Sequence, residues 1–306
     1  WIHHTETNQW SLAVSLKHEY EPDLEIPSQT TWHVVVDESY PLGYIAVYPD
    51  KLHGIGRTFP HQMLNTEGAS ELPWRRGNIC ASTHLRNFGR ELLTKEPWHP
   101  SRRLAWYVER SLLWLSAAAS GTLNSAKDQF ELPDFGTVEG QDLPSIAFNE
   151  NKSTFIHWQQ SSVTSGFVKL IPDASARHVQ LVREFQSKQL RPVVVQTWPR
   201  RLVEDIVRSD LGAWILLPHV PTLDPYQAPQ TWGELANAVN AMGIDFWGQL
   251  ESLSNRLRNG QPFVFLIGFP VKERNDDPWC QISWQALAVP ALATGAQAPN
   301  GFRRNS

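Results

Sequence analysis

The sequence predicts an α+β domain followed by an α/β domain, and three observations support this division. Short β-branched and aromatic runs separated by tight turns occupy residues 10–59, which favours an antiparallel meander. One long amphipathic helical pattern comes next. Beyond a stretch rich in Gly, Pro and acidic residues, apolar runs alternate with helical patterns, which favours α/β layering. The predicted domains are residues 1–136 and 153–306, joined by a linker at 137–152.

Each element of the first domain has its own local signal. β-branched and aromatic runs predict strands at 10–16, 31–36, 44–48 and 55–59. Ser101 is the expected N-cap of a helix over 101–119, and Gly121 stands where a C-terminal cap belongs. Apolar residues at i, i+4 spacing predict the helix's buried face, and its charged residues are expected on other faces. The apolar set is Leu104, Val108, Leu112 and Leu115, and the charged set is Arg103, Glu109 and Arg110.

The second domain is predicted from the same kinds of pattern. Apolar runs predict strands at 155–158, 166–171, 192–198, 213–217, 262–268 and 281–287. Helical patterns predict helices over 176–186 and 231–257. The domain lacks a Gly-x-Gly-x-x-Gly loop after a strand, so the sequence predicts no ATP site in it.

Composition excludes several function classes. With 41% hydrophobic and 19% charged residues, the chain is typical of a folded protein rather than a disordered one. Its net charge of −4 gives no electrostatic basis for binding nucleic acid or an anionic membrane. No apolar run approaches the ~20 residues that span a bilayer. Two distant cysteines make no disulfide framework, which favours a cytoplasmic location, and no metal site is predicted.

Cys80 is the strongest candidate for chemistry. A thiolate is a good nucleophile and the natural carrier of a thioester. Arg75, Arg76 and Gly77 precede it closely, and positive charge or backbone N–H groups there would stabilise a thiolate. His84, four residues further on, is a candidate partner on one helix face. The other cysteine, Cys280, is expected to be a buried strand residue.

The order of motifs in residues 10–133 resembles the ubiquitin-conjugating enzyme family. The meander is followed by Tyr48-Pro49, Phe59-Pro60-His61, Gly77-Asn78-Ile79-Cys80 and then Trp98-His99-Pro100 before a helix. That family has a Tyr-Pro bend, a His-Pro-Asn tripeptide, a Gly-x-Ile-Cys active site and a Trp-x-Pro element. The ending Asp128–Pro133 is similar to bacterial members, in which the conjugating domain often precedes an adenylating domain of the ThiF type.

The resemblance assigns roles to individual residues. It implies that Cys80 forms the thioester and that His61, the tripeptide histidine, supports the active-site loop. Where the family has proline and asparagine, this chain has Gln62 and Met63. The family's asparagine steadies the loop and the tetrahedral oxyanion, which methionine cannot do. The nearby substitutes are Asn65 and Asn78, between which the sequence does not choose, and Asp128 is the candidate gate acid.

The expected function is therefore conjugation of a ubiquitin-like protein, in the setting of bacterial anti-phage defence. Cys80 would accept that protein from an adenylating domain, fused or separate, and pass it to an amine of a protein target, with lysine the expected acceptor. The chain itself would need no cofactor, because the adenylating domain uses the ATP. Two alternatives stay open: a non-catalytic scaffold of the same fold that binds ubiquitin-like proteins, and a thiol hydrolase using Cys80 and His61.

The second domain is expected to be non-catalytic. Leu266–Pro270, Trp284–Leu287 and Gly301–Arg303 look like the segment that joins the conjugating and adenylating domains in those bacterial fusions. It is interpreted as an α/β linker or a degenerate, inactive adenylation fold.

Overall fold

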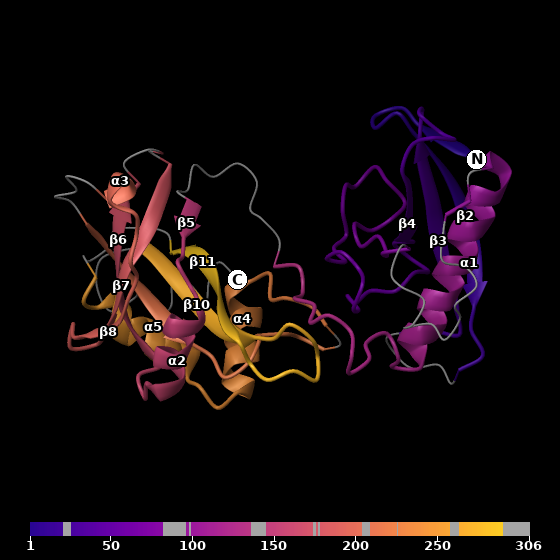
Figure 1. The fold of residues 1–306 in the computed structure, drawn as a ribbon. Coiled ribbons are helices and arrows are strands. Elements are labelled where there is room, and N and C mark those ends of the chain that lie inside the picture. Colours follow the sequence, from indigo (N-terminus) through magenta and orange to yellow (C-terminus); the bar gives the residue numbers. More distant parts are fainter. Residues whose placement is uncertain are drawn as a thin grey trace. The chain divides into compact units, whose positions relative to one another are not determined.

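A computed structural model describes residues 1–20, 26–81, 96–97, 99–135, 145–173, 176, 178–203, 209–224, 226–257 and 263–289. The chain forms two compact units, each with its own sheet (Figure 1). Unit 1 contains residues 1–136 together with 222–228, and unit 2 contains the rest. The segment 222–228 therefore belongs to unit 1, although it comes from the second half of the sequence.

Unit 1 is an antiparallel sheet with one long helix. The sheet has the order β1-β2-β3-β4. Its strands are β1 (Ile2–His4), β2 (Gln9–Lys17), β3 (Gln29–Asp37) and β4 (Ile45–Pro49), and the helix is α1 (Pro100–Ala119). The predicted strands at 10–16, 31–36 and 44–48 are confirmed. The strand predicted at 55–59 is wrong: Ile55 and Phe59 are buried, but their apolar side chains fill the core from irregular backbone.

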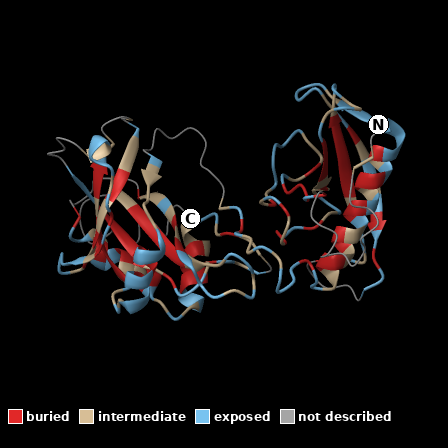
Figure 2. Ribbon diagram, in the orientation of Figure 1, coloured by how far each residue is buried: buried red, intermediate tan, exposed pale blue. Residues whose placement is uncertain are grey.

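The core of unit 1 lies between the sheet and α1. Alternate residues of β3, Trp32, Val34 and Val36, are buried on one face of the sheet. Trp114 of α1 packs against Trp32, with ring centroids 5.8 Å apart. Figure 2 shows the buried strands and the buried stripe of the helix. This packing fixes α1 relative to the loops that follow β4.

The ends of α1 differ in how well the sequence predicted them. The helix begins at Pro100, one residue before the expected start, and His99 rather than Ser101 is the N-cap. Proline is favoured at this first position because its missing N–H would have no intrahelical acceptor. The predicted C-terminal cap is confirmed: Gly121 has φ +67° and donates to Ala118 O at 3.1 Å. Thr122 donates to Ala117 O at 2.8 Å, which completes a Schellman motif.

The predicted buried face of α1 is wrong in part. Leu115 is buried as expected, but Leu112 is exposed. Two arginines that were expected on other faces, Arg103 and Arg110, are buried. The buried stripe includes Trp106, Trp114 and both arginines, so the large aromatic side chains set the helix rotation. Long arginine stems can pack in such a stripe while the guanidinium reaches a backbone acceptor.

Unit 2 is a mixed sheet with helices, and its order is β11-β10-β9-β6-β7-β5, with β8 paired to β7. The pairs β9–β10 and β5–β7 are parallel and the other pairs are antiparallel, so the α/β expectation is corrected to a mixed sheet. The strands are β5 (Ser145–Ala147), β6 (Ser165–Pro172), β7 (Val179–Ser187), β8 (Pro192–Val195), β9 (Asp210–Leu216), β10 (Phe263–Val271) and β11 (Gln281–Val289). The helices are α2 (Lys152–Gln160), α3 (Arg200–Val203), α4 (Trp232–Ala241) and α5 (Phe246–Ser254).

Three predictions for unit 2 are corrected. The stretch 155–158 lies in α2, because Asn151 and Thr154 form a capping box that starts a helix. The helix predicted at 176–186 is the strand β7, which pairs along both of its edges. The helix predicted over 231–257 is two helices, interrupted where Gly243 takes φ +78°. The predicted strands at 166–171, 192–198, 213–217, 262–268 and 281–287 are confirmed in β6, β8, β9, β10 and β11.

Aromatic rings fill the core of unit 2 on both faces of its sheet. On one face, Trp158 of α2 contacts Phe185, Trp214 and Trp284. On the other face, Phe246 of α5 contacts Phe265 of β10, with centroids 6.1 Å apart. Neighbouring residues of a strand point to opposite faces, so the sheet is covered on both sides.

Candidate active site

Cys80 lies at the end of a short antiparallel ribbon in unit 1. An isolated bridge pairs Gln62 with Ile79. Cys80 N donates to His61 O at 2.9 Å, and Met63 N donates to Asn78 O at 3.0 Å. Gln62 and Ile79 point into the protein and are buried, whereas Cys80 is exposed. The alternation of the ribbon therefore places Met63, Asn78 and Cys80 on its outer face, where Met63 and Cys80 are exposed and Asn78 is covered.

Gln62 holds this ribbon from the inside. Its amide Nε2 donates to Gly77 O at 2.9 Å, and its Oε1 accepts from Phe59 N at 3.0 Å. Gly77 has no room for a side chain, because an added Cβ would lie 2.7 Å from the Cβ of Asn65. Gln62 thus takes part in fixing the strand that leads to Cys80.

Asn65 is committed to the backbone of its own loop. Its Nδ2 donates to Ile55 O at 2.9 Å and to Arg57 O at 2.8 Å. Its Oδ1 accepts from Arg75 Nε at 2.8 Å. An amide has two N–H hydrogens, and both are used here, so Asn65 is placed to support the loop. Arg75, which sequence reasoning placed beside the thiol, is a partner of Asn65.

Asn78 is the amide that shares the outer face with Cys80. It is buried, and its Nδ2 donates to the hydroxyl of Tyr44 at 3.1 Å. This bond uses one of its two amide hydrogens. Burial raises the pKa of Tyr44, and the nearby Cys80 raises it further. The phenol is therefore neutral at physiological pH and serves as a hydrogen-bond acceptor.

His61 is held by a carboxylate that the sequence did not point to. Its Nδ1 lies 3.0 Å from Glu131 Oε2, and its backbone N donates to both Glu131 oxygens at 3.1 Å. His61 takes φ +60°, a conformation that costs energy in a residue with a Cβ. Burial raises the pKa of Glu131, and His61 opposes that shift. The pair fixes the ribbon residue that lies opposite Cys80.

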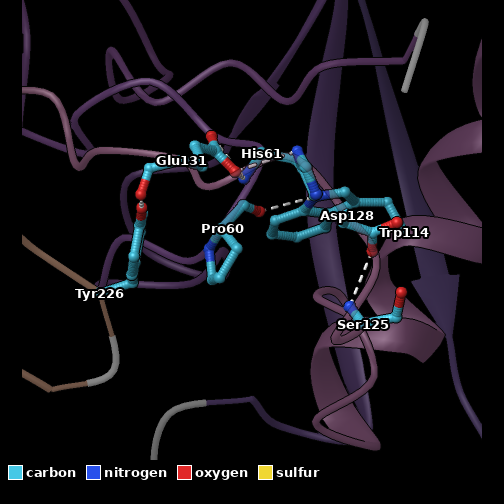
Figure 3. A network of polar contacts seen from close by, with 7 residues as sticks. All are labelled: Pro60, His61, Trp114, Ser125, Asp128, Glu131 and Tyr226. Carbon is cyan, nitrogen blue, oxygen red and sulfur yellow. Dashed lines mark hydrogen bonds and ion pairs between the residues drawn. The ribbon is translucent and has the colours of Figure 1, made fainter. Parts of the chain in front are cut away.

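Figure 3 shows the extension of this network. The hydroxyl of Tyr226, in the segment 222–228, donates to the backbone oxygen of Glu131. Trp114 Nε1 donates to Pro60 O at 3.3 Å. Thr58 Oγ1 donates to Gln227 Oε1 at 3.4 Å, and the adjoining Ala228 is buried. The loop that carries His61 is thereby tied both to α1 and to a segment far along the chain.

The remaining candidates are placed as follows. Asp128, the candidate gate acid, accepts from Ser125 N at 2.7 Å in a local turn. His84 and Trp98 lie outside the described residues. His99 is bonded to Ser101 Oγ at 2.8 Å. Cys280 was expected to be buried but is exposed, because it precedes β11 in a connecting loop.

Arg110 is a second residue that sequence reasoning missed. It extends from α1, and its Nε donates to Ala81 O at 2.6 Å, one residue after Cys80. Burial lowers the pKa of its guanidinium, and the neighbouring Cys80 acts in the opposite direction. A signal was available, since an arginine followed by aromatic residues at helical spacing can share their buried stripe.

The described residues show neither a metal-binding cluster nor a membrane-spanning helix. The parts of the chain with a described placement hold no group of three or more His, Cys, Asp or Glu side chains arranged to bind a metal. Of the described helices, not one is both long and apolar enough to cross a bilayer.

Fold and site together define a class: a chain of two units, the first an α+β unit that presents a cysteine on a supported surface ribbon, the second a mixed sheet. Residues 121–306 match the family model of the Cap2 central linker domain. The chain belongs to this family. It is also 30% identical over 299 residues to the ATP-dependent ubiquitin transferase-like protein Cap2 of Enterobacter hormaechei subsp. hoffmannii (strain UCI 50).

That alignment covers 96% of this chain and 49% of the relative, so the chain spans about half of the relative's length. The sequence predicted a relationship to bacterial proteins that resemble ubiquitin-conjugating enzymes. This relationship is confirmed at the level of the Cap2 family.

Proposed function

We propose that unit 1 is a ubiquitin-conjugating-like domain and that Cys80 carries a ubiquitin-like protein as a thioester. The observation that carries this proposal is the exposed Cys80 on a ribbon whose inner residues are hydrogen-bonded in place. The name of the Enterobacter relative, ubiquitin transferase-like, supports the same reaction class.

The proposed reaction has two steps. The Cys80 thiolate attacks the thioester carbonyl of a ubiquitin-like protein on an adenylating domain; a new C–S bond forms and the old thiolate leaves. An amine of the target, with lysine the expected acceptor, then attacks the Cys80 thioester; an amide forms, the amine loses a proton and the Cys80 thiolate leaves. The thioester is already activated, so positioning supplies most of the rate. ATP would be spent by the adenylating domain, fused or separate.

Asn78 is the proposed hydrogen-bond donor to the tetrahedral oxyanion. It replaces the family's asparagine, where this chain has Met63. Its amide lies two residues before Cys80 on the same face of the ribbon, whereas both hydrogens of Asn65 are already used. A donor of this kind contributes about 100- to 1,000-fold to the rate in other enzymes. His61 and Asn65 are proposed to support the loop, and Asp128 stays the candidate gate acid.

Loading of the purified chain tests the proposal. The chain is incubated with a ubiquitin-like protein, its adenylating domain and ATP, and mass spectrometry should show an adduct that thiols remove. Cys80→Ser should give an adduct that resists thiols, and Cys80→Ala should give none. Cys280→Ser is the matched control and should load normally. An adduct retained by Cys80→Ala would refute the assignment, and partner binding without any adduct would point to the scaffold function.

A second candidate, the thiol hydrolase, is favoured by one specific observation. Such an enzyme needs an acid that orients its histidine, and Glu131 lies 3.0 Å from His61 Nδ1. If it operates, a preformed thioester of a ubiquitin-like protein should be hydrolysed without any acceptor amine. Glu131→Gln should then slow hydrolysis by 10-fold or more, as expected for loss of an orienting acid. Equal hydrolysis by Glu131→Gln and the parent chain would exclude this function.

A further inference from the structure

The peptide bond between Pro60 and His61 is held on both of its polar sides. Its carbonyl oxygen, on Pro60, accepts from Trp114 Nε1 at 3.3 Å. Its N–H, on His61, donates to both carboxylate oxygens of Glu131 at 3.1 Å (Figure 3). One partner belongs to α1 and the other to the segment after α1. Two parts of the chain therefore fix the plane of a single peptide in the loop that faces Cys80.

This peptide is the central one of the turn at residues 59–62. In a turn with proline second, the central peptide can face either way, and only one orientation gives the third residue a positive φ. Here the third residue is His61, at φ +60°. Glycine is favoured at such a position, because a Cβ makes the conformation costly. After a flip, the peptide oxygen would face the Glu131 carboxylate and the peptide N–H would face the indole N–H of Trp114. Both partners therefore stabilise the positive-φ orientation.

The side chain of His61 adds to the same interaction. Its Nδ1 lies 3.0 Å from Glu131 Oε2, so one carboxylate holds both the backbone N–H and the imidazole. Glycine would adopt the conformation more easily but could not form this second contact. The backbone oxygen of Glu131 accepts from the Tyr226 hydroxyl, which fixes the main chain that carries the carboxylate.

The orientation of the turn determines where the backbone acceptor for Cys80 lies. His61 O accepts from Cys80 N at 2.9 Å, and His61 is the residue whose N–H Glu131 holds. We propose that Glu131 is a positioning residue: it holds the turn at 59–62 in its positive-φ orientation and so sets the backbone position of Cys80 for acyl transfer. This inference rests on the proposed function of Cys80. Thioester exchange depends on positioning, and a misplacement of about 1 Å can reduce a rate by about 100-fold.

Loading kinetics of the full chain test this inference, with an adenylating domain charged with its ubiquitin-like protein as the donor. Glu131→Ala should load about tenfold more slowly at saturating donor, with no change in the donor concentration that gives half the maximal rate. Glu131→Gln should recover most of that rate, since its oxygen still accepts from His61 N and its amide can donate to Nδ1 when the imidazole hydrogen is on Nε2. Glu109→Ala removes an exposed carboxylate of α1 and is the matched control, which should load normally. Normal loading by Glu131→Ala would overturn the inference.

Substitution of His61 tests whether the backbone conformation is the cause. In the Glu131→Ala background, His61→Gly should raise the loading rate by about threefold or more, because glycine adopts a positive φ without the carboxylate. With Glu131 present, His61→Val should load at least about tenfold more slowly than His61→Gly, since a β-branched residue resists a positive φ. A double variant no faster than Glu131→Ala would overturn the inference. If Glu131→Ala fails to fold, equal rates for the two single His61 variants would overturn it.

Hydrogen exchange at single residues separates this inference from the proposed function, because it needs no partner. The Cys80 amide donates to His61 O, so it should exchange about tenfold faster in Glu131→Ala, while the amides of β3 are unchanged. Unchanged exchange at Cys80 would overturn the inference. Faster exchange in a chain that never forms a thioester adduct would refute the conjugation proposal alone. Adduct formation at the parent rate by Glu131→Ala would refute the role of Glu131 alone.

Discussion

The two units each contain a polar network, but the network in unit 1 leads to the protein surface and the network in unit 2 stays within the core. In unit 1 the buried Gln62 forms hydrogen bonds to the backbone of the ribbon whose last residue, Cys80, is exposed to solvent. In unit 2 the partly buried Glu150 accepts bonds from Thr154, Trp158, Gln196 and Trp284, all of which belong to the core or its edge. The two networks have similar hydrogen bonding, and they differ in that the one in unit 1 leads to an exposed cysteine whereas the one in unit 2 lies within the core.

Removing the central ring of the aromatic core of unit 2 should have the largest effect. Trp158→Ala would leave a cavity among Phe185, Trp214 and Trp284, and such truncations cost about 3–5 kcal/mol. Hydrogen exchange followed by mass spectrometry should show lost protection in β7, β9 and β11. Protection in β2 and β3, and alkylation of Cys80, should be unchanged. Equal loss in both units would show that their stabilities are not separate.

Changing Glu150 should lower the stability of unit 2 without changing the loading of Cys80. Glu150→Ala leaves indole and amide donors without an acceptor and should lower the stability of unit 2 by about 1–3 kcal/mol. Glu150→Gln keeps an acceptor oxygen and should cost less. The urea midpoint of unit 2, followed by exchange, measures both variants, and Cys80 loading should be the same in each.

The stability of unit 2 should depend on pH through the carboxyl group of Glu150. Burial raises the pKa of Glu150, against which its four hydrogen-bond donors act. Its pKa is then higher in the folded than in the unfolded state, so this group stabilises unit 2 most at low pH. That contribution is lost as pH rises from the ordinary value near 4.5 through the higher folded value. Glu150→Gln should flatten the urea midpoint of unit 2 over this range, and an unchanged slope would contradict the assignment.

A matched change in unit 1 should affect reactivity more than stability. Gly77→Ala forces a Cβ to within 2.7 Å of Asn65 Cβ, so the strand leading to Cys80 must shift. Overpacking of this kind costs about 1–3 kcal/mol. The rate of Cys80 loading should fall several-fold in protein that still melts cooperatively. Gly56→Ala, where no atom lies within 4 Å of the added Cβ, is the control and should load normally.

The smallest effect is expected at Tyr226. Tyr226→Phe removes the hydrogen bond to the Glu131 backbone, which is worth about 0.5–1.5 kcal/mol. Exchange protection should decrease at residues 58–63 and 130–132, with α2 and β7 unaffected. Tyr20→Phe, an exposed tyrosine, should show no change. Unaltered protection at 58–63 would mean that the segment 222–228 does not support the loop.

The sequence predicted what depends on local patterns. β2 and β3 follow from β-branched runs, and Gly121 follows from the need for a positive φ after a helix. The helix predicted over 176–186 is the strand β7: Leu181, Val182 and Phe185 fit helical spacing, Val179, Leu181 and Phe185 fit strand alternation, and pairing on both edges decides for the strand. Local preference is weak where tertiary pairing competes with it.

The residues of the candidate site also fall into two groups, those that a local pattern indicates and those that only the tertiary structure brings close. Cys80, His61, Asn65 and Asn78 belong to a stretch of about 20 residues and could be found from motif spacing. Arg110 reaches Ala81 across 29 residues, and Glu131 reaches His61 across 70. Neither pairing has a local signature, because it depends on the rotation of α1 and on the path of the chain after it.

The segment 222–228 means that the polypeptide passes between the units three times, after residues 136, 221 and 228. A fragment cut at Gly136 would therefore lack Tyr226 and the buried Ala228, although its own sequence would be intact. For the same reason, exchanging only residues 1–136 between relatives would pair the loop that carries His61 with a segment 222–228 from the other protein. We therefore expect residues 1–136 and the connection between β9 and α4 to be inherited together, because the two segments form one unit.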